Sequence, residues 1–468
     1  MRLYNRITRE DIEYFCKLLP ERVFSGDNIL TDYCHDEMTE YGTFMPEAVL
    51  QALSTDEISK VLKYCNERNI AVTPRGAGTG LCGGCVAIHG GIVLSTEKMK
   101  KVIEVDTNNM TATLEPGILL MEIPQILEGT GLFYPPDPGE KTATIGGNAM
   151  TNAGGMRAVR YGVTRDYILG MEVVLADGTV LQLGGKTVKT SSGYSLIDLM
   201  IGSEGTLGFL TKLIIKLIAE PKVNVSLLIP FDDLDACIDA VQKVMICGCD
   251  PTAVEFMERE VISCAEVYLG KHFPDNSADA YLLVRLDGTS MEALQGRIDI
   301  LTETALSVGA KDVLLADTNE RKESIWNARG AFLEAIKGST TTMDECDVVV
   351  PRSVISRFLR ETMQIAKEQG IRICSFGHAG DGNLHIYVCR DDLSEKQWKI
   401  KIDTVMQKLY STAALMKGEV SGEHGIGHAK RKYLEDSLGE RQIMLMKGIK
   451  KVFDPKGILN PGKVADRI

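Results

Sequence analysis

The spacing of apolar residues in the first part of the chain predicts alternating helices and strands. Residues 6–20 place Ile12, Phe15 and Leu19 on one face of a helix. Residues 54–65 begin with a Ser/Thr cap and continue as an apolar stripe, which predicts a second helix. Short apolar runs at 46–50, 70–73 and 92–95 are typical of buried strands. This part of the chain therefore mixes both kinds of element.

From residue 102 the pattern favours strands, and it changes again after Pro221. Residues 102–115 read as a hairpin, 117–128 as a helix, and 171–176, 180–183 and 213–217 as strands. The run 144–155 is too rich in Gly, Asn and Thr to predict a helix or a strand, so we expect a ligand or a close backbone contact there.

Beyond residue 222 strands and helices alternate regularly, which predicts an α+β domain with an antiparallel sheet. The expected strands are 225–229, 253–257, 281–286, 312–315, 348–351, 371–376 and 384–388. The expected helices are 233–247, 261–269, 290–308, 353–369 and 395–417, with a further helix around residues 326–332.

Length and charge narrow the function classes. A chain of 468 residues predicts two or three domains. A net charge of −12 argues against a nucleic-acid surface, which would need a basic stripe. No apolar run reaches the ~18–20 residues of a membrane helix, and the first residues do not resemble a secretory signal. Together with twelve Cys that show no paired framework, this favours a cytoplasmic protein.

Three glycine clusters stand out at 75–84, 144–155 and 201–208. Five of the ten residues from Arg75 to Gly84 are Gly, and they follow a predicted strand. Backbone N–H groups of such a loop can converge on a phosphate. The spacing is not GxGxxG and no helix pattern follows, so the Rossmann fingerprint is not met. The alternative is a structural turn, and Cys82 and Cys85 read as small residues of a tight loop.

Two later stretches carry candidate chemistry. His378 and His385 lie seven residues apart across a Gly-rich turn, and Glu423 precedes His424 directly. Two imidazoles and one carboxylate suit a borderline divalent metal, which would leave His424 as a proton acceptor. The alternative for His385 is a core histidine bonded to backbone. Alone, this set would be equally at home in a hydrolase.

The order of these motifs adds a specific resemblance. The chain carries, in order, PRGAGTG, PPDP, TIGGN with NAGG, GSEGTLG, GHAGDGNLH, GEHG and NPGK. Over about residues 35–465 it resembles FAD proteins of the vanillyl-alcohol oxidase type, in the D-2-hydroxy-acid dehydrogenase branch. That branch includes D-lactate dehydrogenases, the D subunit of glycolate oxidase and D-2-hydroxyglutarate dehydrogenases.

The resemblance implies an α+β fold with a split, two-part FAD-binding domain and a cap. The FAD domain would take 1–220, in two subdomains of about 1–105 and 106–220. The cap with its antiparallel sheet would take 221–420, and 421–468 would return to the FAD domain. FAD would be bound non-covalently, since no histidine occurs between 36 and 88.

The resemblance also implies a set of cofactor residues, named here by region. The pyrophosphate would be held by Arg75, Gly76, Ala77, Gly78, Thr79 and Gly80. The flavin would be lined by Pro138, Thr144, Gly147, Asn148, Asn152 and Gly154. Gly205 and Gly208 would lie at the adenosine end, and Asn460 at the isoalloxazine edge.

The implied reaction is oxidation of a small D-2-hydroxy acid, first D-lactate to pyruvate, with glycolate or D-2-hydroxyglutarate as alternatives. Flavin N5 would take the hydride. One divalent metal (Zn, Fe or Mn) at His378, His385 and Glu423 would polarise the substrate, and His424 would be the base. Arg329 would clamp the carboxylate, unless it pairs with Glu334 or another acid on the surface. The resembling 2-hydroxyglutarate enzymes carry a Lys where Glu345 and its acidic neighbours stand, which favours a monocarboxylate.

The electrons would then leave through a separate carrier, because the chain shows neither clustered Cys nor a nicotinamide motif. The resemblance implies an electron-transfer flavoprotein or an Fe–S subunit, including electron-bifurcating complexes that couple lactate oxidation to NAD and ferredoxin. Two other classes stay open: a non-redox FAD transferase of the same superfamily, and an electron-relay subunit without turnover.

Overall fold

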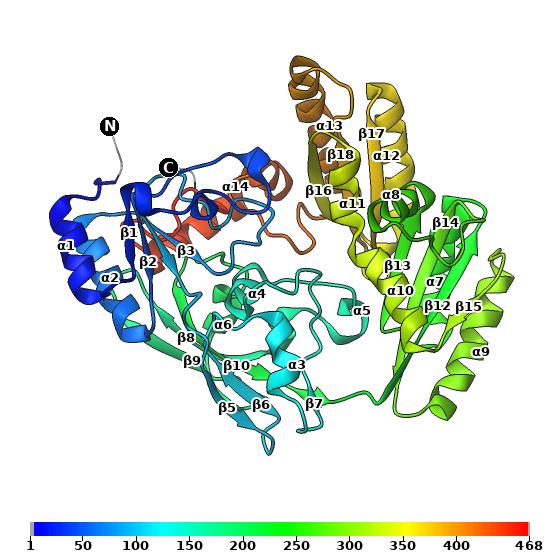
Figure 1. Ribbon diagram of the computed structural model, residues 1–468, viewed down its shortest axis with the longest axis horizontal. Helices are drawn as coiled ribbons and strands as arrows, with labels where there is room; N and C mark the ends of the chain where they lie inside the picture. Colours follow the sequence, from blue (N-terminus) through cyan, green and yellow to red (C-terminus); the bar gives the residue numbers. More distant parts are fainter. Residues whose placement is uncertain (1–3, 467–468) are drawn as a thin grey trace. The chain divides into compact units, whose positions relative to one another are not determined.

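The computed structural model describes residues 4–466 and divides them into two compact units (Figure 1). Unit 1 contains the residues up to Gly154, Val163–Glu220 and the residues from Glu423 onward. Unit 2 contains Gly155–Gly162 and Pro221–Gly422. No helix in the described part of the chain is both long enough and apolar enough to cross a membrane.

The first sheet of unit 1 has the order β1-β2-β4-β3 (Val23–Ser25, Ala48–Gln51, Ile92–Ser95, Val72–Arg75). β4 runs parallel to both β2 and β3. Helices α1 (Arg9–Leu18) and α2 (Thr55–Arg68) cover this sheet with buried side chains such as Phe15 and Leu62. The Ser54 hydroxyl caps α2 by accepting from the Glu57 amide, as the sequence predicts. The strand expected at 70–73 begins instead at Val72, beside the returning Leu459.

The second sheet of unit 1 is antiparallel, in the order β5-β6-β10-β8-β9. Its strands are Val102–Asp106, Thr111–Leu114, Phe209–Lys216, Ile168–Val174 and Val180–Gly184. The hairpin predicted at 102–115 is confirmed as β5 and β6. A two-stranded ladder joins β7 (Leu132–Phe133) to β11 (Ile218–Ala219). The single helix expected at 117–128 is shorter, with a 3-10 turn at Leu120–Glu122 followed by α3 (Ile123–Ile126).

The run 144–155 contains a helix that propensity does not predict. α4 spans Ile145–Thr151, with the Thr144 hydroxyl accepting from the Gly147 amide at its start. Asn152 ends it with a φ of 54°. A Cβ on Gly146 would lie 2.5 Å from Pro116 Cβ, so the small residues permit close packing. Tertiary contact overrides the weak local preference here.

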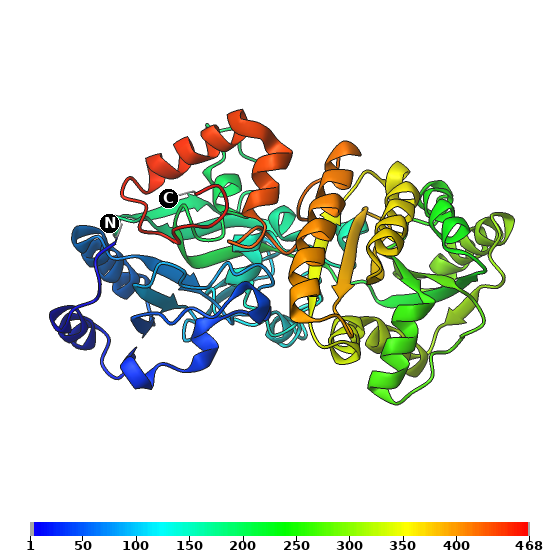
Figure 2. The ribbon, with the colours of Figure 1, turned by 90° about the horizontal axis from the view of Figure 1, so that it is seen from above.

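The other elements of unit 1 are short, apart from the C-terminal helix. They are the 3-10 turns Gly26–Asn28, Thr31–Cys34, Thr39–Tyr41 and Thr164–Tyr167, and α6 (Leu196–Met200). The helix α14 (Arg431–Phe453) bends where Gly439 leaves the helical conformation, as Figure 2 shows.

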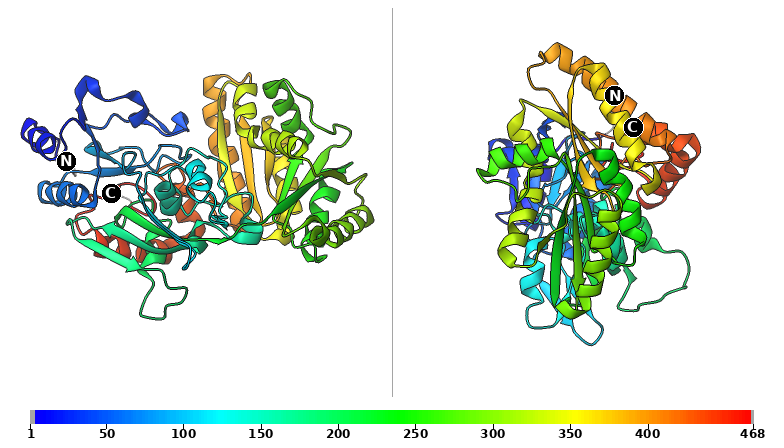
Figure 3. Two further views of the ribbon diagram at one scale, coloured as in Figure 1. Left: turned by 60° about the horizontal axis from the view of Figure 1, so that its bottom comes forward. Right: turned by 90° about the vertical axis from the view of Figure 1, so that its right-hand side faces the viewer.

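Unit 2 is built on a seven-stranded antiparallel sheet in the order β15-β12-β14-β13-β17-β18-β16, with helices on both faces (Figure 3). In that order the strands are Leu314–Ala316, Val223–Phe231, Ala280–Gly288, Ala253–Glu258, Arg372–His378, Asn383–Cys389 and Met343–Val349. The helices are α5 (Ala158–Tyr161), α7 (Leu234–Ile246), α8 (Arg259–Leu269), α9 (Met291–Ser307), α10 (Asn319–Gly330), α11 (Phe332–Ser339), α12 (Ile355–Gln369) and α13 (Glu395–Leu415). This arrangement confirms the predicted α+β cap.

Residues 155–162 lie in the stretch that sequence reasoning assigned to the first domain, but they pack with unit 2. The Arg160 guanidinium donates to Thr252 Oγ1 at 3.2 Å, and the Tyr161 hydroxyl donates to Asp287 Oδ2 at 3.0 Å. These contacts tie α5 to the ends of β13 and β14.

Candidate functional site

The two histidines of the GHAGDGNLH stretch lie on one face of the unit 2 sheet. They belong to β17 and β18, where His378 pairs with Asn383 and Phe376 pairs with His385. Paired residues in an antiparallel sheet share a face, so the two rings are diagonal neighbours. Their Nε2 atoms lie 3.5 Å apart. The connecting turn needs Gly382, which has a φ of 90° and whose Cβ would lie 2.1 Å from the Val350 carbonyl oxygen.

Register explains why this face is apolar along most of its length and polar at one end. Residues Phe376, Tyr387 and Phe332 contribute to a buried cluster beneath α8, α10 and α11. Continuing in steps of two along each strand, the same face carries six polar residues: Glu255, Glu345, Asp347, His378, Asn383 and His385. All six are buried. Buried charges are retained where they are paired or bind an ion.

A buried carboxylate lies behind each histidine ring. His378 Nδ1 is 2.7 Å from Glu255 Oε1. His385 Nδ1 is 3.4 Å from Glu345 Oε1 and 3.9 Å from Asp347 Oδ1. Because a carboxylate accepts hydrogen bonds, Nδ1 of His378 carries the proton of the neutral ring and Nε2 keeps its lone pair. The lone pair of His378 is thus directed towards the other ring.

Arg329 lies on α10 and its partner is a buried acid. Its Nε and Nη2 donate to Glu255 Oε2 at 2.9 and 2.7 Å, and its guanidinium carbon lies 4.5 Å from the centre of the Phe376 ring. The pairing with Glu334 that the sequence left open does not occur. Burial raises the pKa of Glu255, but His378 and Arg329 outweigh it and hold that pKa below its usual value. Glu255 therefore contacts two predicted site residues at once.

Asp347 holds the chain segment that leads to Glu423. Its carboxylate accepts from Asn383 Nδ2 at 2.7 Å, the Ser421 hydroxyl at 2.8 Å and the Gly422 amide at 3.1 Å. Glu423 is the next residue along the chain and is counted with unit 1. In that unit the His424 ring lies 3.7 Å from the Glu423 carboxylate.

The first glycine loop of unit 1 is supported from below by Arg75. The guanidinium donates to the carbonyls of Asp32 at 2.6 Å and His35 at 2.8 Å. A Cβ on Gly76 would lie 2.3 Å from Thr144 Oγ1, and a Cβ on Gly78 would lie 2.0 Å from Arg75 Nη2. Among residues 4–466, the amides of 76–81 donate to no other group of the chain. The loop thus presents unsatisfied N–H groups, as a phosphate cradle requires.

Asp36 is a support of this loop that sequence reasoning missed. Its carboxylate accepts from the Gly83 amide at 2.5 Å and from the Met38 amide at 3.1 Å. Burial raises the pKa of Asp36 to about 6. Asp36 lies in a stretch rich in acids, so composition offered no signal that this acid was special.

The second glycine cluster places its predicted residues around α4. The Asn148 side chain is buried, and its Nδ2 has no hydrogen-bond partner among the described residues. Asn152 Oδ1 accepts from the Arg165 amide at 2.9 Å. A Cβ on Gly154 would lie 2.9 Å from Glu423 Oε2. The Pro138 carbonyl accepts from Lys141.

The third glycine cluster is joined to the C-terminal segment by Glu204. One carboxylate oxygen accepts from the Ile426 amide at 2.7 Å and the other from the Gly427 amide at 2.8 Å. Asn460 Nδ2 donates to the carbonyls of Gly84 at 2.8 Å and Glu204 at 2.7 Å. The predicted isoalloxazine role of Asn460 is therefore accompanied by a structural one.

The glycines of this cluster differ in how closely they pack. A Cβ on Gly205 would lie 2.7 Å from Pro74 Cγ, whereas one on Gly208 would lie 3.3 Å from Met200 Sδ. Only the first contact is too close for any side chain.

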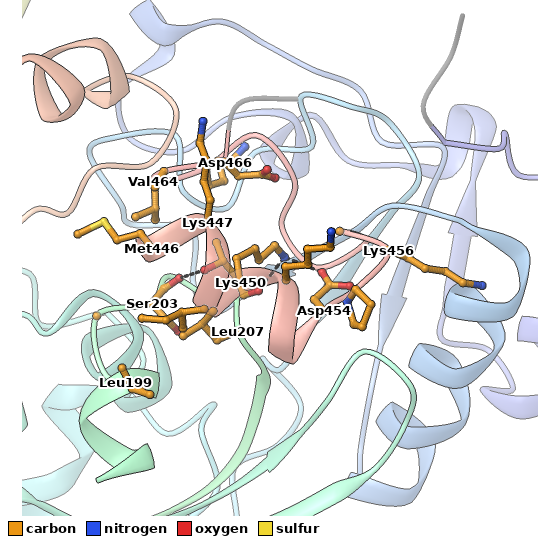
Figure 4. Close-up of a pocket in the computed structure, with 18 of the residues that line it drawn as sticks. Leu199, Ser203, Leu207, Met446, Lys447, Lys450, Asp454, Lys456, Val464 and Asp466 are labelled. Carbon is orange, nitrogen blue, oxygen red and sulfur yellow. Dashed lines mark hydrogen bonds and ion pairs between the residues drawn. The ribbon is translucent and has the colours of Figure 1, made fainter. Parts of the chain in front are cut away.

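A cavity of about 540 Å³ in unit 1 lies beside the third glycine cluster (Figure 4). Leu199, Leu207 and Met446 supply apolar walls, and Lys447 and Lys451 also line the cavity. The Lys450 ammonium is taken up by the Thr206 and Leu459 carbonyls and by Asp454. None of the predicted cofactor, metal or catalytic residues lines this cavity.

The residues present fit both groups that the sequence implied. The open amides of 76–81 and the buried Asn148 amide suit FAD. Two convergent Nε2 atoms, with carboxylates behind the rings, suit a divalent metal. The roles of the individual residues stay predictions.

Two parts of the chain match families of known proteins. Residues 220–464 match the C-terminal domain of FAD linked oxidases, and 46–184 match a FAD binding domain. The chain is 49% identical to a D-lactate dehydrogenase of Anaerostipes hadrus, over 99% of both chains. It is 39% identical to glycolate oxidase subunit GlcD of Bacillus subtilis, over 92% of this chain and 91% of that one.

Among solved structures, p-cresol methylhydroxylase with bound substrate superposes with a TM-score of 0.82 at 19% identity, over 98% of both chains. The fold expected from the sequence, a two-part FAD-binding domain of the vanillyl-alcohol oxidase type with an α+β cap, is confirmed.

Proposed function

This chain belongs to the FAD-linked oxidases, and we propose that it oxidises a small D-2-hydroxy acid, first of all D-lactate to pyruvate. The observation that carries the proposal is the 3.5 Å separation of His378 Nε2 and His385 Nε2. Two metal–nitrogen bonds of about 2.0–2.1 Å at a tetrahedral angle would place the nitrogens about 3.4 Å apart. The rings are thus spaced for one ion, such as Zn, Fe or Mn.

Glu423 is the proposed third ligand. It follows Gly422, whose amide donates to the buried Asp347 carboxylate. Asp347 also accepts from Ser421 and Asn383, so the chain is held immediately before Glu423. These hydrogen bonds restrict the backbone immediately before Glu423.

FAD would be held by the residues expected from the sequence: Arg75, Gly76, Ala77, Gly78, Thr79, Gly80, Pro138, Thr144, Gly147, Asn148, Asn152, Gly154, Gly205, Gly208 and Asn460. When bound, FAD supplies the hydride acceptor and the metal supplies Lewis-acid polarisation. His424 would take the proton of the substrate hydroxyl. Arg329 would bind the substrate carboxylate through Nη1, which donates to no other group in residues 4–466.

The acids beside His385 favour a monocarboxylate. Glu345 and Asp347 are buried and lie 3.4 and 3.9 Å from the ring. A second carboxylate on the substrate would meet these charges in a poorly solvated place, where repulsion is strong. D-Lactate and glycolate are therefore preferred over D-2-hydroxyglutarate.

The proposed electron acceptor is a second protein, either an electron-transfer flavoprotein or an Fe–S subunit. The similar Bacillus subtilis protein is named a subunit of glycolate oxidase, which supports an assembly of several chains. An acceptor panel with each carrier protein, compared with NAD alone, would identify the partner.

Anaerobic reduction of the bound flavin tests the proposed reaction. The purified protein should lose its flavin absorbance with D-lactate, more slowly with glycolate, and not with L-lactate. An equimolar divalent ion should be present. If D-lactate, glycolate and D-2-hydroxyglutarate all leave the flavin oxidised, the proposal is wrong.

A further inference from the structure

We propose that Glu255 is a positioning residue that fixes both the metal-ligand ring of His378 and the carboxylate clamp Arg329. This inference rests on the proposed function, because it assigns Glu255 to the same site. It also concerns a residue that no sequence motif marks. Its consequence is that one buried carboxylate aligns the metal-binding part and the substrate-binding part together.

The position of Glu255 follows from strand register. Phe256 pairs with Gly377 and Met257 pairs with Phe376, so the antiparallel ladder brings Glu255 level with His378. The side chain points to the face that holds the histidines, and it is 0% exposed. The register of the sheet therefore places this carboxylate in the site, and its position does not depend on a loop.

The two carboxylate oxygens have different tasks. Oε1 lies 2.7 Å from His378 Nδ1, while Oε2 accepts from both Nε and Nη2 of Arg329. The first contact leaves Nε2 of His378 as the ligand atom. The second fixes the guanidinium plane by two bonds and leaves Nη1 for a substrate. The guanidinium carbon also lies 4.5 Å from the centre of the Phe376 ring, a contact that restricts its rotation further.

The energetics of buried ion pairs indicate that the Glu255–Arg329 pair orients side chains more than it stabilises the fold. A fully buried ion pair is often no more stabilising than apolar residues of the same volume, because desolvation offsets the attraction. Two residues, His378 and Arg329, share Glu255, and both are predicted to contact the metal or the substrate. Elsewhere in the unit 2 sheet the buried Asp287 pairs with the half-buried Arg285 at 2.7 Å; this pair involves no predicted site residue and offers a comparison.

Glu255→Gln tests the proposal, because an amide keeps the shape but can accept from only one of its two donors. The readout is Zn²⁺ affinity of the FAD-loaded protein, measured by competition with a chromophoric chelator. We expect Zn²⁺ to bind about 10–100-fold more weakly, as for other residues that orient ligands. KM for D-lactate should also rise, because Arg329 loses its orientation. Glu255→Asp should restore part of both properties.

Asp287→Asn is the control, since it removes a buried acid paired with arginine from the same sheet. It should leave Zn²⁺ affinity and KM unchanged. Unaltered Zn²⁺ affinity and KM in Glu255→Gln would overturn the proposal, and so would equal losses in Asp287→Asn.

The two proposals fail separately. If no hydroxy acid reduces the flavin of the unchanged protein while Glu255→Gln still weakens Zn²⁺ binding, the proposed substrate is wrong and the positioning role stands. If Glu255→Gln does not fold, Glu255→Asp carries the test: it keeps the charge but lengthens the 2.7 Å contact, so Zn²⁺ should bind more weakly than in the unchanged protein, and unaltered affinity would overturn the proposal.

Discussion

The glycine loop of unit 1 and the histidine face of unit 2 are built in opposite ways. Every second residue of the loop is glycine (Gly76, Gly78 and Gly80), and its amides at 76–81 have no partners among the described residues. The histidine face consists of side chains, and His378 and Glu255 are already joined at 2.7 Å. The N–H groups of the first region are therefore ready to donate hydrogen bonds to a ligand. The second is prepared by interactions within the protein.

This difference teaches how each region should respond to change. In the loop, an added methyl group is enough to cause damage, because Gly76 and Gly78 approach Thr144 and Arg75 too closely for a Cβ. On the histidine face, side-chain volume matters less than which ring nitrogen of each histidine carries the proton. FAD binding and metal binding should therefore be separable by mutation.

The largest effect should come from losing a metal ligand. His385→Ala removes one of the convergent Nε2 atoms, and we expect flavin reduction by D-lactate to slow by about 10³-fold, the loss of several kcal/mol of Lewis-acid stabilisation. FAD content should not change. Stopped-flow flavin absorbance and metal analysis check both points.

His272→Ala is the control for this variant, because the His272 side chain is 94% exposed. Dialysis against a chelator should reproduce the effect in the unchanged protein, and added Zn²⁺, Fe²⁺ or Mn²⁺ should reverse it. Full activity without metal would show that the histidine face does not act as a metal site, contrary to the proposed contrast with the glycine loop.

The second effect concerns FAD alone. Gly76→Ala places a Cβ 2.3 Å from Thr144 Oγ1, so the loop must shift and overpacking of about 1–3 kcal/mol should weaken FAD binding roughly 10–100-fold. The ratio of flavin to protein absorbance after gel filtration measures the loss. Zn²⁺ affinity should stay as it was.

Gly185→Ala is matched to this variant, because a Cβ there would meet nothing within 4 Å. Normal FAD content in Gly76→Ala would show that the loop is a structural turn.

Sequence reasoning found the residues of the site that belong to motifs, and missed those that support them. The glycine clusters and the His378–His385 spacing are local patterns, so they could be read directly. Glu255 is 123 residues away from His378 and is one of 64 acids, so no spacing marks it. Only the strand pairing of β13 with β17 brings the two together. Asp36 was missed because its partner Gly83 is distant in sequence. Glu204 lies inside the GSEGTLG motif, but its role depends on contacts with the distant Ile426 and Gly427 amides.

A smaller effect should follow from Glu204→Gln. The carboxylate accepts from the amides of Ile426 and Gly427, which follow the proposed base His424 closely. Glutamine can satisfy one amide and leaves the other unbonded, at a cost of about 1–3 kcal/mol that loosens the segment. We expect the rate of flavin reduction at saturating D-lactate to fall about 10-fold. FAD content should stay unchanged.

Glu220→Gln, a change of an exposed acid, is the control for this variant. A rate equal to that of the unchanged protein would mean that Glu204 holds no catalytic segment.

The smallest effect is a pH dependence of stability that originates at Asp36. Its pKa of about 6 in the folded protein exceeds the ordinary 3.8, because the carboxyl is buried. The folded state therefore holds the proton more tightly, and this contribution is complete below pH 3.8 and disappears as pH rises through 6. Between pH 5 and pH 7 the unchanged protein should lose about 1 kcal/mol of unfolding free energy that Asp36→Asn does not lose. Urea unfolding at both pH values measures this double difference, with Asp27→Asn, an exposed acid nearby, as the control. An equal pH dependence in all three proteins would show that the Gly83 amide, and with it the glycine loop, does not rely on a buried acid.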